Sequence, residues 1–385
     1  MGGRTINSTA GVLERPNVDV PRPARRLGRI TALLPAHNEE ANLPDALASL
    51  RGQTEPPVDI VVIADNCTDD TEQVATELGA TVFRTRGNVH KKAGGLNQAL
   101  DVLLPQMQPD DLILVMDADS LLDPTFLEGA RRALEVRPGS RAHRRGIILG
   151  GVGGTFLGAE GGGLLGTFQR NEYARYARDV RRLHGKALVL TGTASVFTVK
   201  VLREVAAARR AGELPDRSGA GNVYDVHVLT EDNELSLALM HLGYGILAPR
   251  ECTLVTEVMT TWGDLARQRS RWKRGALENI VDYGFTRVTA SYWGRQVLSA
   301  VGLLATALYV ASLLWGLFTE IHLHPFWLAA SLVFCLERVV TVRQRGWRQM
   351  LLAAPLVIEM AYDLFLQLVQ AQAFMNALLR RERKW

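Results

Sequence analysis

Apolar residues form short runs separated by amphipathic stretches over most of this chain, and longer runs near its C-terminus. The short runs at 29–36, 58–64 and 112–116 each end in polar residues. The stretches 40–51 and 70–79 between them have the pattern of helices, and two aspartates open the second as capping residues would. Buried runs that alternate with helices predict an α/β domain with a largely parallel sheet.

The C-terminal quarter has the pattern of a membrane region. Residues 296–318 contain no charged side chain and are long enough to span a bilayer as a helix. A second run, 326–342, is shorter and carries two charges towards its end. A third extends from about 350 to 379. Together they predict two or three membrane helices within residues 291–385.

Polar residues interrupt the third run in a regular way. Glu359, Asp363, Gln367 and Gln370 are spaced by 4, 4 and 3 positions, which places them on one face of a helix. At membrane depth such a face must meet other protein, a water-filled path or the interface. Three arrangements stay open: a helix in the headgroup region, a helix lining a path for a substrate, and plain packing against other helices.

The flanking segments predict an orientation. Residues 1–28 combine charges with prolines and have no apolar core for export, so they are expected to form a disordered tail. Basic residues lie between the second and third runs, whereas residues 319–325 carry no Lys or Arg. The positive-inside rule therefore keeps residues 1–294 in the cytoplasm. The basic residues at 380–384 agree with this only if the third run is re-entrant or interfacial.

Composition narrows the class of protein. The chain has 385 residues and a net charge of +4, with no dense basic run interleaved with aromatics, which argues against nucleic-acid binding. Its three cysteines, Cys67, Cys252 and Cys335, fit no zinc spacing and no disulfide framework, so a reducing compartment is expected. The glycine-dense stretch 150–166 lacks the ending of a phosphate loop and is interpreted as a flexible connection.

Candidate chemistry lies where the predicted strands end. Polar residues follow each strand at 35–40, 65–70 and 117–119, and ligands of such sheets bind beyond the carboxyl ends of the strands. In an extended segment Asp117 and Asp119 would point the same way. Two adjacent carboxylates repel each other unless a hard cation lies between them. Ligands that are all oxygen favour Mg²⁺ or Mn²⁺ over zinc.

Six ordered motifs support a specific resemblance. The segments PAHNEE, VIADNCTDD, HKKAGGLN, MDADS, LTEDNE and QRSRW resemble those of the family 2 glycosyltransferases. The resemblance covers roughly residues 30–275 and is closest to the membrane synthases of cellulose, chitin, hyaluronan and poly-N-acetylglucosamine. It implies a GT-A-type nucleotide-binding domain at 29–290, followed by membrane helices at 291–385.

The resemblance implies a pocket for a UDP-sugar at the strand ends. The residues that it assigns to the nucleotide are Pro35, His37, Glu39, Asp65, Lys92 and Asp117. Within this set Asp65 would contact the uracil, and Asp117 would neighbour the ribose and the diphosphate. Asp119 would coordinate the Mg²⁺ or Mn²⁺ ion, with Asp117 as a second candidate ligand.

The later motifs imply the catalytic and acceptor residues. Asp232 matches the catalytic base, and Glu231 and Arg271 are the other catalytic candidates. Gln268 and Trp272 complete a Gln-x-x-Arg-Trp signature that would hold the diphosphate and the acceptor. Elementary chemistry agrees, since attack on the anomeric carbon needs a base for the acceptor hydroxyl and positive charge near the departing diphosphate. Single displacement with inversion follows from the resemblance.

Each of these roles has an ordinary structural alternative. Asp232 or Thr230 could cap the helix that follows, and Trp272 could be a core residue. Thr193 lies in the segment 191–195, which is interpreted either as an acceptor contact or as a tight turn.

The function predicted is transfer of a sugar, N-acetylglucosamine first among the candidates, to a growing β-linked polysaccharide by a multi-pass enzyme of the cell membrane. Gly95 and the absence of a Phe-x-Val-Thr-x-Lys segment after Trp272 disfavour cellulose. Transfer of one sugar to a lipid acceptor is the close alternative. A dinucleotide-dependent oxidoreductase lacks its Gly-x-Gly-x-x-Gly motif, and a non-catalytic scaffold or transport subunit would be expected to have lost the carboxylates. The expected partners are the donor, a glycan or lipid acceptor and membrane lipid, and homo-oligomer formation stays open.

Overall fold

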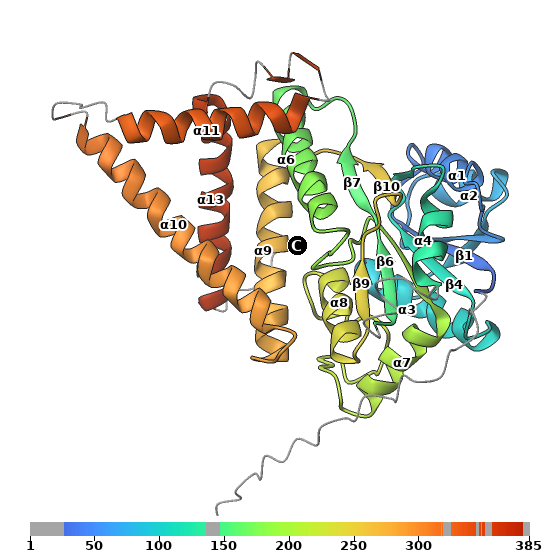
Figure 1. The fold of residues 1–385 in the computed structure, drawn as a ribbon. Coiled ribbons are helices and arrows are strands. Elements are labelled where there is room, and N and C mark those ends of the chain that lie inside the picture. Colours follow the sequence, from blue (N-terminus) through green and yellow to red (C-terminus); the bar gives the residue numbers. More distant parts are fainter. Residues whose placement is uncertain are drawn as a thin grey trace, which may run out of the picture.

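The computed structural model describes residues 27–135, 147–316, 325–343 and 356–379, together with positions 318, 346–347 and 349–350. An α/β domain is followed by long C-terminal helices (Figure 1). Residues 1–26 of the predicted tail lie outside the described residues. Its last two positions belong to the domain, because Leu27 is buried and Gly28 N donates to Asp110 O at 2.8 Å. The prediction that the tail extends to residue 28 is wrong by these two residues.

The main sheet has seven strands in the order β3-β2-β1-β4-β8-β6-β9. Along the chain they are β1 (Ile30–Ala36), β2 (Asp59–Ala64), β3 (Thr81–Arg84), β4 (Leu112–Met116), β6 (Leu149–Gly153), β8 (Ala194–Thr198) and β9 (Gly245–Leu247). Strand β8 is antiparallel to both β4 and β6, whereas the other neighbours are parallel. The predicted α/β fold with a mostly parallel sheet is confirmed.

Alternating side chains of the central strands enter two separate cores. Leu34 belongs to a cluster with α1 (Leu43–Arg51), α2 (Thr71–Glu77) and α4 (Phe126–Leu134). Its neighbour Leu33 points to the opposite face, into a cluster with α3 (Lys91–Leu103), α7 (Val199–Arg210) and α8 (Glu231–His241). Because helices cover both faces, a continuous apolar run is what a central strand needs.

The glycine-dense stretch is ordered, so its interpretation as a flexible connection is wrong. It forms β6, then β7 (Thr155–Gly158), and then the start of α6 (Gly163–Arg182). Strand β7 joins a small sheet in the order β5-β10-β7, with β5 (Leu121–Leu122) and β10 (Thr253–Thr256). A Cβ atom at Gly151 would lie 2.5 Å from Leu190 Cδ1 and 2.9 Å from Phe197 Cδ1. Glycine is required here by close packing rather than by flexibility.

The C-terminal helices are α9 (Trp262–Tyr283), α10 (Ala290–Gly316), α11 (Pro325–Val342) and α13 (Leu356–Leu378). Helix α13 packs along α9, and α11 packs against α6 (Figure 1). Within the part of the chain that the structure describes, one helix is long and apolar enough to cross a membrane, at Ala290–Ser312. Helices form at all three predicted runs, but a membrane region of two or three helices stays a prediction.

The polar face of α13 is turned towards protein. Glu359 is 1% exposed and accepts a hydrogen bond from Arg175 Nη1 of α6 at 3.0 Å. Arg338 of α11 pairs with both Glu359 and Asp363. Of the three arrangements left open by the sequence, these contacts favour packing against other helices.

Substitution of Gly151 by alanine is expected to lower the free energy of unfolding by about 1–3 kcal/mol, because the new methyl group overpacks Leu190 and Phe197. Urea titration followed by circular dichroism measures this change. Gly294→Ala in α10 is the control, since no described atom lies within 4 Å of a Cβ built there. A loss of stability no larger in Gly151→Ala than in Gly294→Ala would contradict the packing argument.

Candidate active site

Lys92 joins segments that are far apart in the sequence. It lies in the first turn of α3, and its Nζ is 2.5 Å from Asp117 Oδ1, just after β4. The same ammonium donates to Gly192 O at 3.0 Å and lies 3.6 Å from Glu231 Oε1. Burial alone would lower the pKa of Lys92, but Asp117 and Glu231 raise it above its ordinary value. Lys92 therefore carries its positive charge at the centre of the site.

Asp232 is held beside this ammonium by backbone donors. Its Oδ2 accepts from Gly192 N at 2.9 Å, and its Oδ1 accepts from Asn233 N at 2.7 Å. Burial, and then the charge of Glu231, raise the pKa of Asp232 to about 6, although Lys92 and the two N–H groups act in the opposite direction. Thr230 occupies the N-cap position of α8, so Asp232 lies in the first helical turn and is not the cap.

Lys92, Glu231 and Asp232 line a small cavity. Tyr224 also forms part of its wall, and no sequence motif indicated this residue. The Tyr224 backbone is clamped by the Asn97 side chain, which accepts from Tyr224 N at 3.0 Å and donates to Tyr224 O at 2.8 Å. Asn97 belongs to the same HKKAGGLN motif as Lys92. A buried asparagine on an otherwise apolar helix face is the signal that could have suggested such a clamp.

The carboxylates after β4 come together through a turn. Ser120 N donates to Asp117 O at 3.2 Å, so the expectation that Asp117 and Asp119 alternate along an extended segment is wrong. The two carboxylates still interact: burial, and then the charge of Asp117, raise the pKa of Asp119 to about 6. Glu39 and Glu257 act on Asp119 in the same direction.

This convergence of oxygen ligands fits Mg²⁺ or Mn²⁺, since like charges brought together in a buried site are stabilised by a hard cation. The described residues contain no group of three or more acidic, histidine or cysteine side chains placed to hold an ion. Asp117 and Asp119 are the residues that would hold such an ion.

The predicted nucleotide residues gather at the ends of β1 and β2. Pro35 lies within β1, which pairs with β4 only as far as Leu33, so the missing N–H of proline removes no bond from that ladder. His37 Nδ1 lies 2.6 Å from Asp65 O. Asp65 is buried, and its Oδ1 accepts from Thr85 Oγ1 at 2.7 Å. Glu39 interacts electrostatically with the carboxylates after β4: burial first, and then nearby carboxylates that include Asp117, raise its pKa.

The loop before β8 brings Thr193 to the same place. Thr193 O accepts from Asp117 N at 3.0 Å, and Thr193 Oγ1 donates to Thr191 Oγ1 at 2.9 Å. The structure therefore brings together Thr193, Asp117, Lys92 and Asp232. Whether Thr193 contacts an acceptor stays a prediction.

The Gln-x-x-Arg-Trp residues lie on α9, further from Lys92. Arg271 is exposed but near Lys91, whose pKa is lowered by burial and then by the Arg271 charge. Gln268 and Trp272 make their contacts with Arg269, a residue that sequence reasoning missed because it occupies a variable position of the signature.

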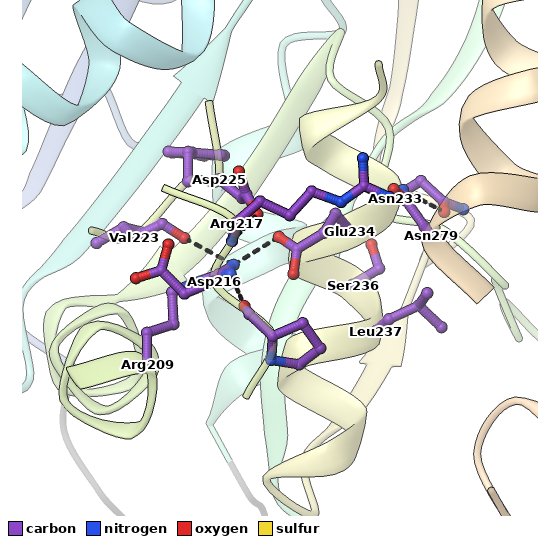
Figure 2. A network of polar contacts seen from close by, with 12 residues as sticks. Arg209, Asp216, Arg217, Val223, Asp225, Asn233, Glu234, Ser236, Leu237 and Asn279 are labelled. Carbon is purple, nitrogen blue, oxygen red and sulfur yellow. Dashed lines mark hydrogen bonds and ion pairs between the residues drawn. The ribbon is translucent and has the colours of Figure 1, made fainter. Parts of the chain in front are cut away.

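Helix α8, which carries Asp232, is fixed by a buried ion pair (Figure 2). Arg209 Nη2 lies 2.5 Å from Glu234 Oε2, and both side chains are almost completely buried. Arg209 also donates to Val223 O at 3.3 Å, while Tyr283 OH donates to Glu234 Oε1 at 2.6 Å. Loss of one member of such a buried pair is costly, so α7, α8 and α9 are held in one arrangement.

Helix α9 also binds the start of α8 directly. Asn279 Nδ2 donates to Thr230 O at 3.1 Å and to Asn233 Oδ1 at 3.0 Å, the second of which is drawn in Figure 2. Gly275 permits this approach, because a Cβ atom there would lie 2.5 Å from Thr230 Oγ1. These contacts lie on either side of Asp232 in the sequence, and they restrict the movement of the first turn of α8.

Comparison with known proteins identifies the class. Residues 31–206 match the model of glycosyl transferase family 2, so the chain carries a family 2 glycosyltransferase domain. The match includes Lys92, Asp117 and Asp119 and ends before Asp232. The predicted family is confirmed, whereas the roles of the individual residues stay predictions.

Three known proteins show what the chain is similar to. Poly-beta-1,6-N-acetyl-D-glucosamine synthase of Staphylococcus aureus (strain COL) is 24% identical over 294 residues, covering 74% of this chain and 62% of the synthase. The synthase of Staphylococcus epidermidis is 24% identical over 261 residues, covering 66% and 55%. The chain thus spans about three fifths of the length of these relatives.

A solved mannosyltransferase of Pyrobaculum calidifontis, in complex with GDP-Man and Mn²⁺, superimposes with a TM-score of 0.56 at 17% identity. The likeness covers 96% of this chain and 92% of that one. At this identity it bears on the fold alone, and it supports the GT-A-like α/β architecture.

Replacement of Lys92 by methionine should destabilise the protein by roughly 2–4 kcal/mol at pH 8 and by less at pH 5. The raised pKa of Asp232 means that its ionisation opposes folding as the pH rises through about 6, and the variant lacks the ammonium that offsets this. Urea titration at both pH values measures the difference. Lys200→Met, which removes the half-exposed partner of Glu204, is the control. Equal losses at pH 5 and pH 8 would contradict this account.

Proposed function

We propose that this protein is an inverting glycosyltransferase that moves N-acetylglucosamine from a UDP-sugar to a hydroxyl group of a growing β-linked polysaccharide. The observation that carries the proposal is the convergence of three carboxylates, Asp117, Glu231 and Asp232, on the Lys92 ammonium. Lys92 and Asp117 lie in the part of the chain that matches the family 2 model. The sugar is inferred from the similarity to the staphylococcal poly-N-acetylglucosamine synthases.

Asp232 is suited to be the general base. With a pKa raised to about 6 it is ionised at neutral pH, yet it is more basic than an ordinary aspartate. The N–H groups of Gly192 and Asn233 fix the carboxylate before any substrate arrives. As the acceptor oxygen bonds to the anomeric carbon, its proton passes to Asp232 and the bond from that carbon to the diphosphate breaks, which releases UDP.

The departing diphosphate requires positive charge. Lys92 is fixed at the centre of the site, and Arg271 is exposed on α9 close to Lys91, so both can reach an anion that binds there. A Mg²⁺ or Mn²⁺ ion held by Asp117 and Asp119 would supply further charge to the same oxygens when bound. The carboxylates that face this region would otherwise repel the nucleotide.

Asp232→Asn is expected to lower kcat by about 10²–10⁴-fold, because the acceptor proton loses its base, while UDP binding changes little. UDP release and UDP binding are measured separately, with exposed Asp45→Asn as the matched control. In the unsubstituted protein, kcat should fall below a pH near 6, where Asp232 takes up its proton. Turnover by Asp232→Asn close to that of Asp45→Asn would refute the assignment of the base.

Helix α10 supports a membrane location for the enzyme. The segment Ala290–Ser312 is apolar, and beyond Tyr292 near its start its apolar side chains are largely exposed, with Val301 55% and Leu304 62% exposed. A surface of this kind is unfavourable in water and favourable in lipid. We therefore place α10 in a bilayer, with the catalytic domain on the cytoplasmic side.

Introducing lysine at both Val301 and Leu304 should release the protein from membranes, since each lysine costs about 2.5–3.5 kcal/mol at the centre of a spanning helix. Resistance to alkaline carbonate extraction is the measurement. The control is the double variant Val102→Lys with Leu183→Lys, which alters two similarly exposed positions of the α/β domain. A protein that is extracted by carbonate without any substitution contradicts the membrane location.

A further inference from the structure

Arg269 lies against Gln268 and Trp272, the two residues that the Gln-x-x-Arg-Trp signature assigns to the diphosphate and the acceptor. Its side chain is buried, at 3% exposure. Nη1 donates to Gln268 Oε1 at 2.8 Å, and the guanidinium carbon lies 4.4 Å from the centre of the Trp272 ring. That distance is within the range of a cation–π interaction. Arg269 therefore touches both Gln268 and Trp272.

A carboxylate from α6 fixes the other side of this guanidinium. Arg269 Nη2 donates to Glu172 Oε2 at 2.9 Å. The same oxygen accepts a hydrogen bond from Tyr362 OH of α13 at 2.7 Å. The contacts thus run from Tyr362 through Glu172 and Arg269 to Trp272, and they cross the three neighbouring helices α13, α6 and α9 (Figure 1).

The position of the Tyr362 hydroxyl is itself set by helix packing. The Tyr362 ring stacks on Phe168 of α6, with ring centres 5.1 Å apart and an angle of 27° between the planes. About one turn earlier on α13, Glu359 accepts from Asn171 Nδ2 and from Arg175 Nη1, each at 3.0 Å. These contacts fix the rotation of α13 about its axis relative to α6.

Stability alone is a weak reason for this arrangement. A buried ion pair is often no more stable than apolar side chains of the same volume. Arg269 instead restricts the orientation of Trp272. A planar guanidinium that is bound on one edge to Glu172 can present its face to the Trp272 ring in few orientations.

We propose that Tyr362, Glu172 and Arg269 form a positioning relay through which the C-terminal helix α13 sets the orientation of Trp272 and Gln268 towards the acceptor. The relay residues do not touch the reacting atoms. They act through Trp272, so a change in the seating of α13 alters how tightly the acceptor is held. The acceptor part of this inference rests on the proposed function, whereas the effect on Trp272 does not.

The test compares Tyr362→Phe with Tyr292→Phe in the full chain. Both variants keep the ring and lose the tertiary contacts of one hydroxyl group. The Tyr292 hydroxyl contacts Leu188 O and Met240 Sδ, which are not part of the relay. The first measurement is acrylamide quenching of Trp272, obtained by subtracting the emission of the matching Trp272→Phe protein. The second is the KM for β-1,6-linked N-acetylglucosamine oligosaccharides and for the donor.

Tyr362→Phe is expected to raise the quenching constant of Trp272 by about twofold, because the ring is no longer held under the guanidinium. Its KM for the oligosaccharide should rise about three- to tenfold with the donor KM nearly unchanged. Tyr292→Phe should change neither quantity. Arg269→Lys, which keeps the charge and loses the planar face, should reproduce both changes if Tyr362→Phe does not fold.

Unchanged quenching of Trp272 in both relay variants would overturn the relay, and so would an equal change in Tyr292→Phe. Failure of the proposed function has a different signature. The unsubstituted protein would then transfer no sugar, while the quenching comparison would still decide whether α13 controls Trp272.

Discussion

The contact on which the site depends is the placement of Lys92 among Asp117, Glu231 and Asp232. Three carboxylates drawn from the end of β4 and the start of α8 would repel one another without the ammonium between them. Because Lys92 lies on α3, this charge balance holds only while α8 stays against α3. The buried pair of Arg209 with Glu234, and the contacts of Asn279 with the first turn of α8, supply that constraint. Buried polar contacts between helices therefore determine where the Asp232 carboxylate lies.

The parts of the site that sequence could predict are those carried by local pattern. Continuous apolar runs predicted β1, β2 and β4, because strands covered on both faces need no polar alternation. The polar residues after these strands are predicted to meet, and His37 Nδ1 lies 2.6 Å from Asp65 O. Lys92, which binds Asp117, was predicted from the motif resemblance and not from the local pattern. The resemblance of six short motifs added Asp232, which lies 40 residues from its partner Gly192.

The parts that could not be predicted depend on tertiary contacts. Tyr224 reaches the cavity wall through Asn97, 127 residues earlier, and no local pattern links the two. The prediction of a flexible glycine-dense stretch is wrong because flexibility and close packing both favour glycine. Only the tertiary neighbours of Gly151 show that close packing is the reason here. Asp117 and Asp119 lie in a turn, whereas the sequence predicted an extended segment with alternating side chains. For Tyr224 and Gly151 the missing information was the position of a segment distant in sequence, whereas the turn at Asp117 is local.

The most direct test of the central claim is UDP release by the detergent-purified full chain. It is measured over a panel of UDP-sugars with an oligosaccharide acceptor, in Mn²⁺ or Mg²⁺ and in EDTA, with the products sized. We expect metal-dependent release of UDP from UDP-N-acetylglucosamine together with long β-linked products. A single-sugar lipid product would keep the transfer chemistry and contradict polymer synthesis. No UDP release from any donor in the presence of metal and acceptor would contradict the claim that this site transfers sugars from UDP.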